Sequence, residues 1–138
     1  MSEYLIAHIG HTFNHHEHIT WWKPDSRGYT ICIDKAGRYS ESEARGICQS
    51  GTCIAVNAED VEPIARSTPY YRTSDGRLAK LYDGGPHRPV ENESQVWRHL
   101  FSARLATPGR VEKPTPMPSN KMRAVYLDAA PATVGAQP

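Results

Sequence analysis

Short runs of apolar residues, several alternating with polar ones, occupy the first half of the chain and predict β-strands. Strands are expected at residues 4–9, 18–22, 28–37 and 52–56. The polar segment 10–17 and the turn-forming segment 24–28 separate the first three of them. Because both segments are rich in residues that favour turns, we expect these strands to be antiparallel neighbours joined by hairpins.

Helices are expected where apolar residues recur at intervals of three and four. Ser40 followed by Glu43 is a capping box, which predicts a helix over about 41–49 that closes at Gly51. Asn57 can cap a second helix, although Pro63 limits its regularity. A third helix is expected over about 92–105, with Asn92 as its cap and an apolar face that contains Trp97.

The last part of the chain differs in composition from the rest. A hairpin is expected over 69–85, around a turn at 74–76, and six of the eleven prolines lie between 108 and 138. We therefore expect a globular domain over residues 1–107 and a Pro-rich tail over 108–138, extended or partly disordered. Residues 108–120 should contact the core little, whereas 121–128 could pair as an edge strand or dock in a groove.

The predicted fold is α+β. We expect a small antiparallel sheet of about four to six strands with two or three helices packed on one face, followed by the Pro-rich tail. The chain has 138 residues and a formal net charge of +1 with neutral histidines, so nonspecific nucleic-acid binding is not expected. It has no apolar run long enough for a membrane helix. With no export signal expected at residues 1–10, Cys32, Cys48 and Cys53 are interpreted as reduced thiols of a cytoplasmic protein.

Five histidines lie close together between residues 8 and 18, before two adjacent tryptophans. Zinc needs three or four converging ligands, and a hairpin could bring together His8, His11, His16 and His18. Glu17 or a cysteine could complete the set. No established zinc motif is present, so a polar loop that tolerates histidine is the main alternative. A third interpretation is a histidine site for an anionic ligand, which would bind more tightly as the pH falls.

Aromatic and basic residues gather just after the histidines. Neighbouring side chains of a strand point to opposite faces, so only one of Trp21 and Trp22 can belong to a surface site. Exposed rings offer stacking and basic side chains hold phosphate. The alternative is that both indoles are covered and the charges form a solvated rim. The predicted ligand-binding residues are Trp21, Trp22, Arg27, Tyr29, Lys35, Arg38 and Tyr39.

Residues 21–48 carry the pattern W-x-P, then G-Y-T, then A-G-x-Y, then E-A. The matching residues are Trp22, Pro24, Gly28, Tyr29, Thr30, Ala36, Gly37, Tyr39, Glu43 and Ala44. In this pattern the chain resembles uncharacterised small accessory proteins of tailed phages and prophages. The resemblance implies a protein that acts inside a bacterial host cell.

Such accessory proteins often block host defence, either by binding a defence protein or by sequestering a nucleotide signal. We therefore expect a non-catalytic binding protein that captures an anionic, nucleotide-like ligand or a host defence protein. The alternative is a metal-dependent hydrolase, with zinc as its cofactor, built on the histidines. Metal analysis of untagged protein separates the two hypotheses.

Overall fold

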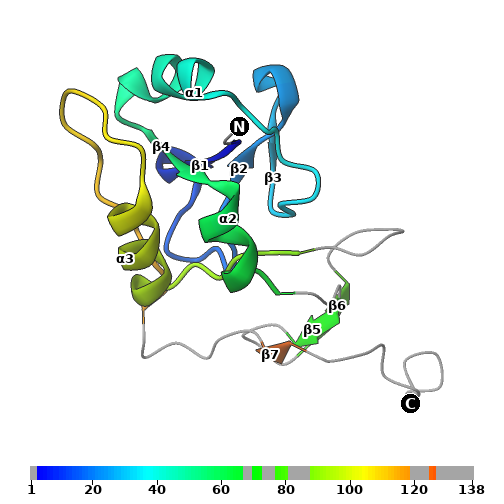
Figure 1. The fold of residues 1–138 in the computed structure, drawn as a ribbon. Coiled ribbons are helices and arrows are strands. Elements are labelled where there is room, and N and C mark those ends of the chain that lie inside the picture. The colour runs from blue at the N-terminus through cyan, green and yellow to red at the C-terminus, as the bar shows by residue number, and fades with distance from the viewer. Residues whose placement is uncertain (1–2, 67–69, 73–76, 81–87, 119–124, 127–138) are drawn as a thin grey trace.

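The computed structural model describes residues 3–66, 70–72, 77–80, 88–118 and 125–126. Its main sheet has four antiparallel strands in the order β3-β2-β1-β4 (Figure 1). Their bounds are β1 (Tyr4–His8), β2 (Trp21–Trp22), β3 (Tyr29–Thr30) and β4 (Cys53–Asn57). β1 and β4 pair along their whole length, from Tyr4 opposite Asn57 to His8 opposite Cys53. The predicted α+β class with an antiparallel sheet is confirmed.

Two strands are shorter than the sequence pattern indicates. β2 contains only the two tryptophans, because His18 forms an isolated bridge with Glu91 rather than with β1. β3 ends at Thr30, since the next residues leave the sheet and Cys32 bridges Pro89. The expected strands 18–22 and 28–37 therefore extend beyond β2 and β3. In those outer parts, His18 and Cys32 form bridges with Glu91 and Pro89 instead of continuing the main sheet.

Three α-helices accompany the sheet: α1 (Glu41–Ile47), α2 (Ala58–Val61) and α3 (Ser94–Ala103). The predicted capping box is confirmed, because the Ser40 hydroxyl accepts from the Glu43 amide and the Glu43 carboxylate accepts from the Ser40 amide. Short 3₁₀ turns follow the first two helices, η3 (Cys48–Ser50) and η4 (Glu62–Ile64). Gly51 closes η3 with a φ of 79°, a conformation that favours glycine.

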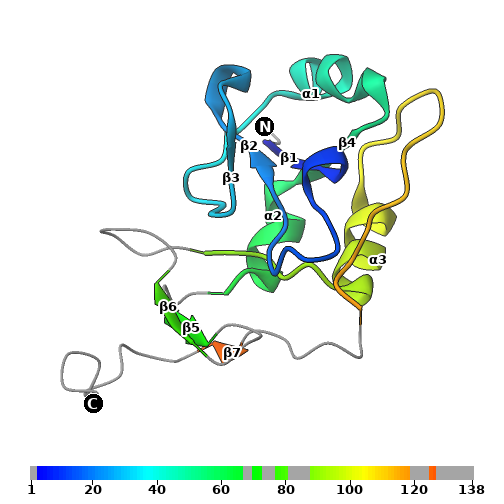
Figure 2. The ribbon, with the colours of Figure 1, turned by 180° about the vertical axis from the view of Figure 1, so that it is seen from behind.

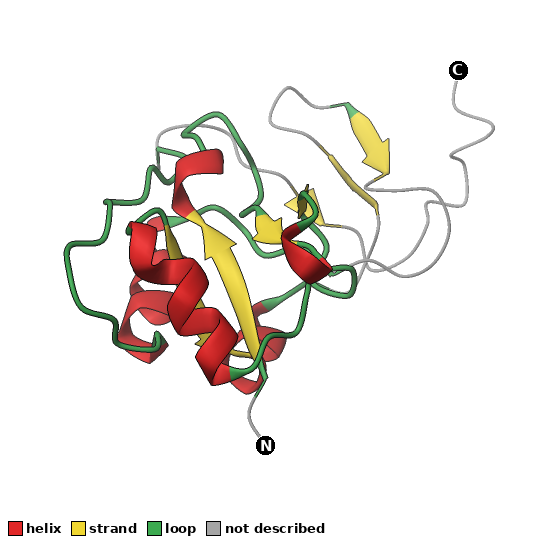
Figure 3. Cartoon of the chain, turned by 90° about the horizontal axis from the view of Figure 1, so that it is seen from above, coloured by secondary structure: helices red, strands yellow, loops and turns green. Residues whose placement is uncertain are grey.

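The helices divide between the two faces of the sheet instead of covering one face. Alternate residues of β1 show the division: Leu5 and Ala7 belong to the core under α2 and α3, whereas Ile6 belongs to the core under α1. Figure 3 shows the helices around the central strands. Since both faces are covered, the residues of β1 after Tyr4 are buried on both sides, which explains why this strand is almost wholly apolar.

A second, smaller sheet has the order β6-β5-β7. It contains β5 (Tyr70–Arg72), β6 (Leu78–Lys80) and β7 (Val125–Tyr126). The pairing of β5 with β6 confirms the predicted hairpin strands, whereas its predicted turn lies outside the described residues. β7 pairs with β5, so a part of the segment 121–128 is an edge strand as expected. No helix within the described ranges is long and apolar enough to cross a membrane.

Residues 110–117, which we call the strap, run along the body of the protein in an extended conformation (Figure 2). The Glu112 amide donates to the Gly51 carbonyl at 2.8 Å, and the Met117 amide donates to the Asn92 carbonyl at 3.0 Å. Met117 is buried, and Val111 packs against the main core. The expectation that this part of the tail contacts the core little is therefore wrong. Prolines prevent regular structure here, but they do not prevent docking.

Candidate functional site

Four aromatic side chains meet at one end of the sheet and form what we call the ring cluster: His8, His11, Trp22 and Tyr29. Ring centroids lie 4.5 Å apart for Trp22 and Tyr29, and 4.1 Å apart for His11 and Tyr29. His8 lies 5.1 Å from Tyr29 and 5.4 Å from Trp22. These separations are those of rings in direct contact.

The backbone explains why these four rings meet. Trp22 and Tyr29 are direct partners in the β2–β3 ladder, so their side chains lie on the same face. His8 is the last residue of β1 and shares the face of Ile6, two residues before it. The 3₁₀ turn η1 (Ile9–His11) follows at once and brings His11 back towards Tyr29.

The cluster has an accessible outer part and a buried base. Tyr29 is 37% exposed, one of two large hydrophobic side chains in the described ranges with that much exposure. His11 is also exposed and Trp22 is half-buried, whereas His8 is 8% exposed. A ligand could therefore contact Tyr29, His11 and Trp22 without disturbing His8.

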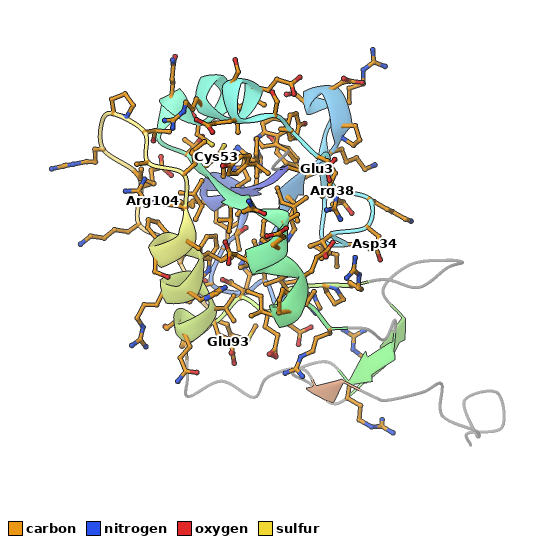
Figure 4. All side chains as sticks on the ribbon, in the orientation of Figure 1. Glu3, Asp34, Arg38, Cys53, Glu93 and Arg104 are labelled. Atoms are coloured by element: carbon orange, nitrogen blue, oxygen red, sulfur yellow. The ribbon has the colours of Figure 1, made fainter. Side chains whose placement is uncertain are left out.

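A hydrogen bond from the Trp22 indole to a buried sulfur fixes the orientation of the indole. Trp22 Nε1 donates to Cys53 Sγ at 3.3 Å. Cys53 lies opposite His8 in the ladder and packs with Cys48 beneath α1 (Figure 4). All three cysteines are free and buried. Burial, and secondarily the nearby Cys53, raises the pKa of Cys48 to about 12, so this thiol stays protonated near neutral pH.

His8 is neutral over the physiological range. Burial, assisted by the nearby His11, lowers its pKa to about 4. Its Nδ1 atom is buried and has no hydrogen-bond partner among the described residues. That edge of the imidazole faces Gly10, where an added Cβ would lie 3.1 Å from His8 Cε1 and 3.4 Å from Nδ1. Glycine at position 10 therefore leaves the room that this ring needs.

Two predicted ligand-binding residues have structural roles instead. Trp21 is fully buried in the core under α2 and α3, on the opposite face from Trp22. Tyr39 is 5% exposed, and its hydroxyl donates to the Lys23 carbonyl and accepts from the Ser26 amide. The second bond holds a strained turn, because Asp25 and Ser26 have φ values of 58° and 54°.

The predicted basic residues are not gathered at one point. Arg38 is engaged in ion pairs with Glu62 at 3.1 Å and with Glu3 at 3.8 Å (Figure 4). Lys35 and Arg27 are exposed, and Arg27 belongs to the short turn that joins β2 to β3. Arg27 is therefore the predicted cation closest along the chain to the two paired aromatic residues, Trp22 and Tyr29.

The four histidines predicted as metal ligands do not converge. His8 and His11 belong to the ring cluster, whereas the His16 ring lies 4.4 Å from His15 and accepts a hydrogen bond from the Phe13 amide. His18 is 4% exposed, and burial lowers its pKa to about 4. Within the described ranges, no three His, Cys, Asp or Glu side chains have an arrangement that could hold a metal ion.

Asn92 has a structural role that the sequence did not reveal. It does not cap α3; Glu93 occupies the N-cap position and makes no side-chain capping bond. Asn92 is instead fully buried, and its Oδ1 accepts from Trp97 Nε1 at 2.7 Å. Its Nδ2 donates to the carbonyls of Phe13, His16 and Thr115. One side chain thus joins the histidine-rich loop, α3 and the strap.

Comparison with protein-family models, with curated proteins and with solved structures finds no match for this chain. The functional argument therefore rests on the geometry of the ring cluster and its surroundings.

Proposed function

We propose that the ring cluster captures a planar, anionic ligand of the nucleotide class, without catalysing a reaction. The observation that carries the proposal is the contact between Trp22, Tyr29 and His11, whose rings are partly or largely accessible. Stacking on such rings stabilises a bound base by about 1–3 kcal/mol. Because the β2–β3 ladder and the Trp22–Cys53 hydrogen bond fix these rings, little side-chain entropy is lost on binding.

The turn after Trp22 supplies positive charge for the anionic part of the ligand. Lys23 and Arg27 lie at its two ends and are exposed, and the Lys23 amide donates to the Gly28 carbonyl at 2.8 Å. A guanidinium can bind a phosphate through two parallel hydrogen bonds, whereas lysine acts as a point charge. We assign the direct contact with the phosphate to Arg27, and a longer-range electrostatic attraction of the phosphate to Lys23.

The setting that we propose is an accessory protein acting in the cytoplasm of a bacterial host cell, since residues 21–48 resemble tailed-phage proteins. Sequestering a nucleotide signal would then act against host defence. A host defence protein is the second candidate partner, because the same half-buried indole is the kind of residue that anchors protein interfaces.

The proposal is tested by thermal shifts and calorimetric titrations with linear and cyclic nucleotides. Tyr29→Ala should weaken nucleotide binding by at least about tenfold, as expected from the loss of one stacking ring. Phe13→Ala is the matched control, because Phe13 is 48% exposed but lies outside the ring cluster. If no nucleotide raises the melting temperature at millimolar concentration, nucleotide capture is wrong and the protein partner becomes the leading hypothesis.

A further inference from the structure

We propose a second binding site, which is independent of the ring cluster: a groove between α3 and the strap that binds a small amphipathic anion. Its ligand would combine one carboxylate or similar anionic group with an apolar body. The groove has a volume of about 360 Å³, within the range of small-molecule sites.

One wall of the groove is a single face of α3. Ser94, Trp97, Arg98 and Phe101 line it, and their spacing of three and four residues places them along one side of the helix. The Trp97 and Phe101 ring centroids lie 6.3 Å apart; Trp97 is 2% exposed and Phe101 is half-buried, so Phe101 offers the more accessible apolar surface of this wall. The hydrogen bond from Trp97 Nε1 to Asn92 fixes the orientation of the larger ring.

The other wall is the strap, with Lys113, Pro114 and Pro116 facing the groove. Hydrogen bonds on both sides of Pro116 hold this wall in place. The Thr115 hydroxyl donates to the Thr12 carbonyl at 2.6 Å, and the Met117 amide donates to the Asn92 carbonyl. Because both walls are anchored to the core, the groove exists before a ligand binds, and binding costs little ordering of the chain.

The charges at the groove select an anion. Arg98 and Lys113 come from opposite walls, no carboxylate is among the lining residues, and neither cation has an ion pair with any described residue. α3 begins beside Ser94 with neither a side-chain cap nor an acidic residue in its first turn. The amides of the first turn of a helix carry partial positive charge, which adds to the potential of the two side chains.

Decanoate is a suitable probe, because it combines a carboxylate with an apolar chain. The chain has three tryptophans, whose indole N–H signals can be separated by ¹⁵N NMR and assigned by single Trp→Phe variants. We expect decanoate to shift the Trp97 signal in a saturable way and to leave the Trp22 signal in place. Decanol, which lacks the charge, should bind at least about tenfold more weakly, since it cannot form charge-assisted hydrogen bonds with the two cations.

The double variant R98Q/K113Q tests the two cations directly. Both side chains are exposed, so the variant should fold normally and weaken decanoate binding by at least about tenfold. Arg110→Gln is the control, because Arg110 is an exposed cation of the strap that does not line the groove. The inference is overturned if decanoate leaves the Trp97 signal unchanged, or if the folded double variant binds it as well as the parent protein. A shift of Trp22 instead of Trp97 would overturn the groove assignment and leave the ring-cluster proposal standing.

Discussion

At the scale of single residues, the two adjacent tryptophans have opposite environments. Trp21 is fully buried under α2 and α3, and Trp22 is half-buried in the ring cluster. Trp21→Ala should therefore lower the free energy of unfolding by about 3–5 kcal/mol. Trp22→Ala should cost clearly less and should abolish ligand binding. Urea denaturation of both variants measures which one loses more stability. Equal losses would contradict the assignment of Trp21 to the core and of Trp22 to the ring cluster.

The sequence predicted that the pleat separates these indoles, but it could not show which one is in the core. Both faces of the sheet are covered by helices, so both positions have apolar neighbours. Tyr39 illustrates the same difficulty, because a tyrosine that supports a turn and a tyrosine that binds a ligand have the same appearance in a sequence. The choice depends on contacts between distant segments.

Two buried histidines should make stability depend on pH. The pKa of His8 and that of His18 are lowered to about 4, well below the ordinary value of 6.5. The unfolded chain therefore binds more protons than the folded chain between these values, and the free energy of unfolding falls as the pH drops from about 6.5 to about 4. The loss is up to about 3 kcal/mol for each histidine.

Urea denaturation at pH 7 and at pH 4.5 measures this effect. In His18→Gln the loss of stability over this interval should be smaller than in the parent protein, because one titrating group has been removed. His15→Gln is the control, since His15 is exposed. An unchanged pH dependence in the His18 variant would show that this histidine does not contribute.

At the scale of elements, local signals predicted the helices better than the strands. The capping box at Ser40 and the Asn57 cap on α2 act within one turn of chain, and both are present as predicted. The strands at 18–22 and 28–37 are shorter than expected, because Glu91 and Pro89 from a distant segment bridge His18 and Cys32. The local pattern of apolar and polar residues does not indicate that a distant segment pairs with these positions.

Asn92 is the element-scale position where one substitution should affect three segments. Asn92→Ala removes partners from the Trp97 indole N–H and from the carbonyls of Phe13, His16 and Thr115. The Trp97 N–H would be buried without a partner, which costs about 1–3 kcal/mol, and the His16 and Thr115 carbonyls would each lose a hydrogen bond, whereas the Phe13 carbonyl keeps the bond from the His16 amide. The total loss should therefore reach about 2–3 kcal/mol. Asn57→Ala removes only a helix cap and should cost about 1 kcal/mol. Chemical denaturation measures both losses of unfolding free energy. If Asn92→Ala and Asn57→Ala lose the same amount, Asn92 does not connect the three segments as described.

At the scale of the whole molecule, the strap belongs to the folded body. Its composition predicted an extended or partly disordered chain with few core contacts, whereas Met117 is buried and Val111 packs against the main core. Truncation after residue 107 should lower the melting temperature by roughly 10 °C or more relative to truncation after residue 118, because buried contacts are lost. A difference of only one or two degrees would show that the strap does not stabilise the fold.

The ring cluster is the central claim, and the indole N–H signals of the whole protein test it most directly. Titration with a purine nucleotide should shift the Trp22 signal, which reports on the hydrogen bond to Cys53, and should leave those of Trp21 and Trp97 in place. The shift should saturate in the parent protein and disappear in Tyr29→Ala. A Trp22 signal that stays fixed at millimolar nucleotide, or one that shifts equally in Tyr29→Ala, would contradict the account.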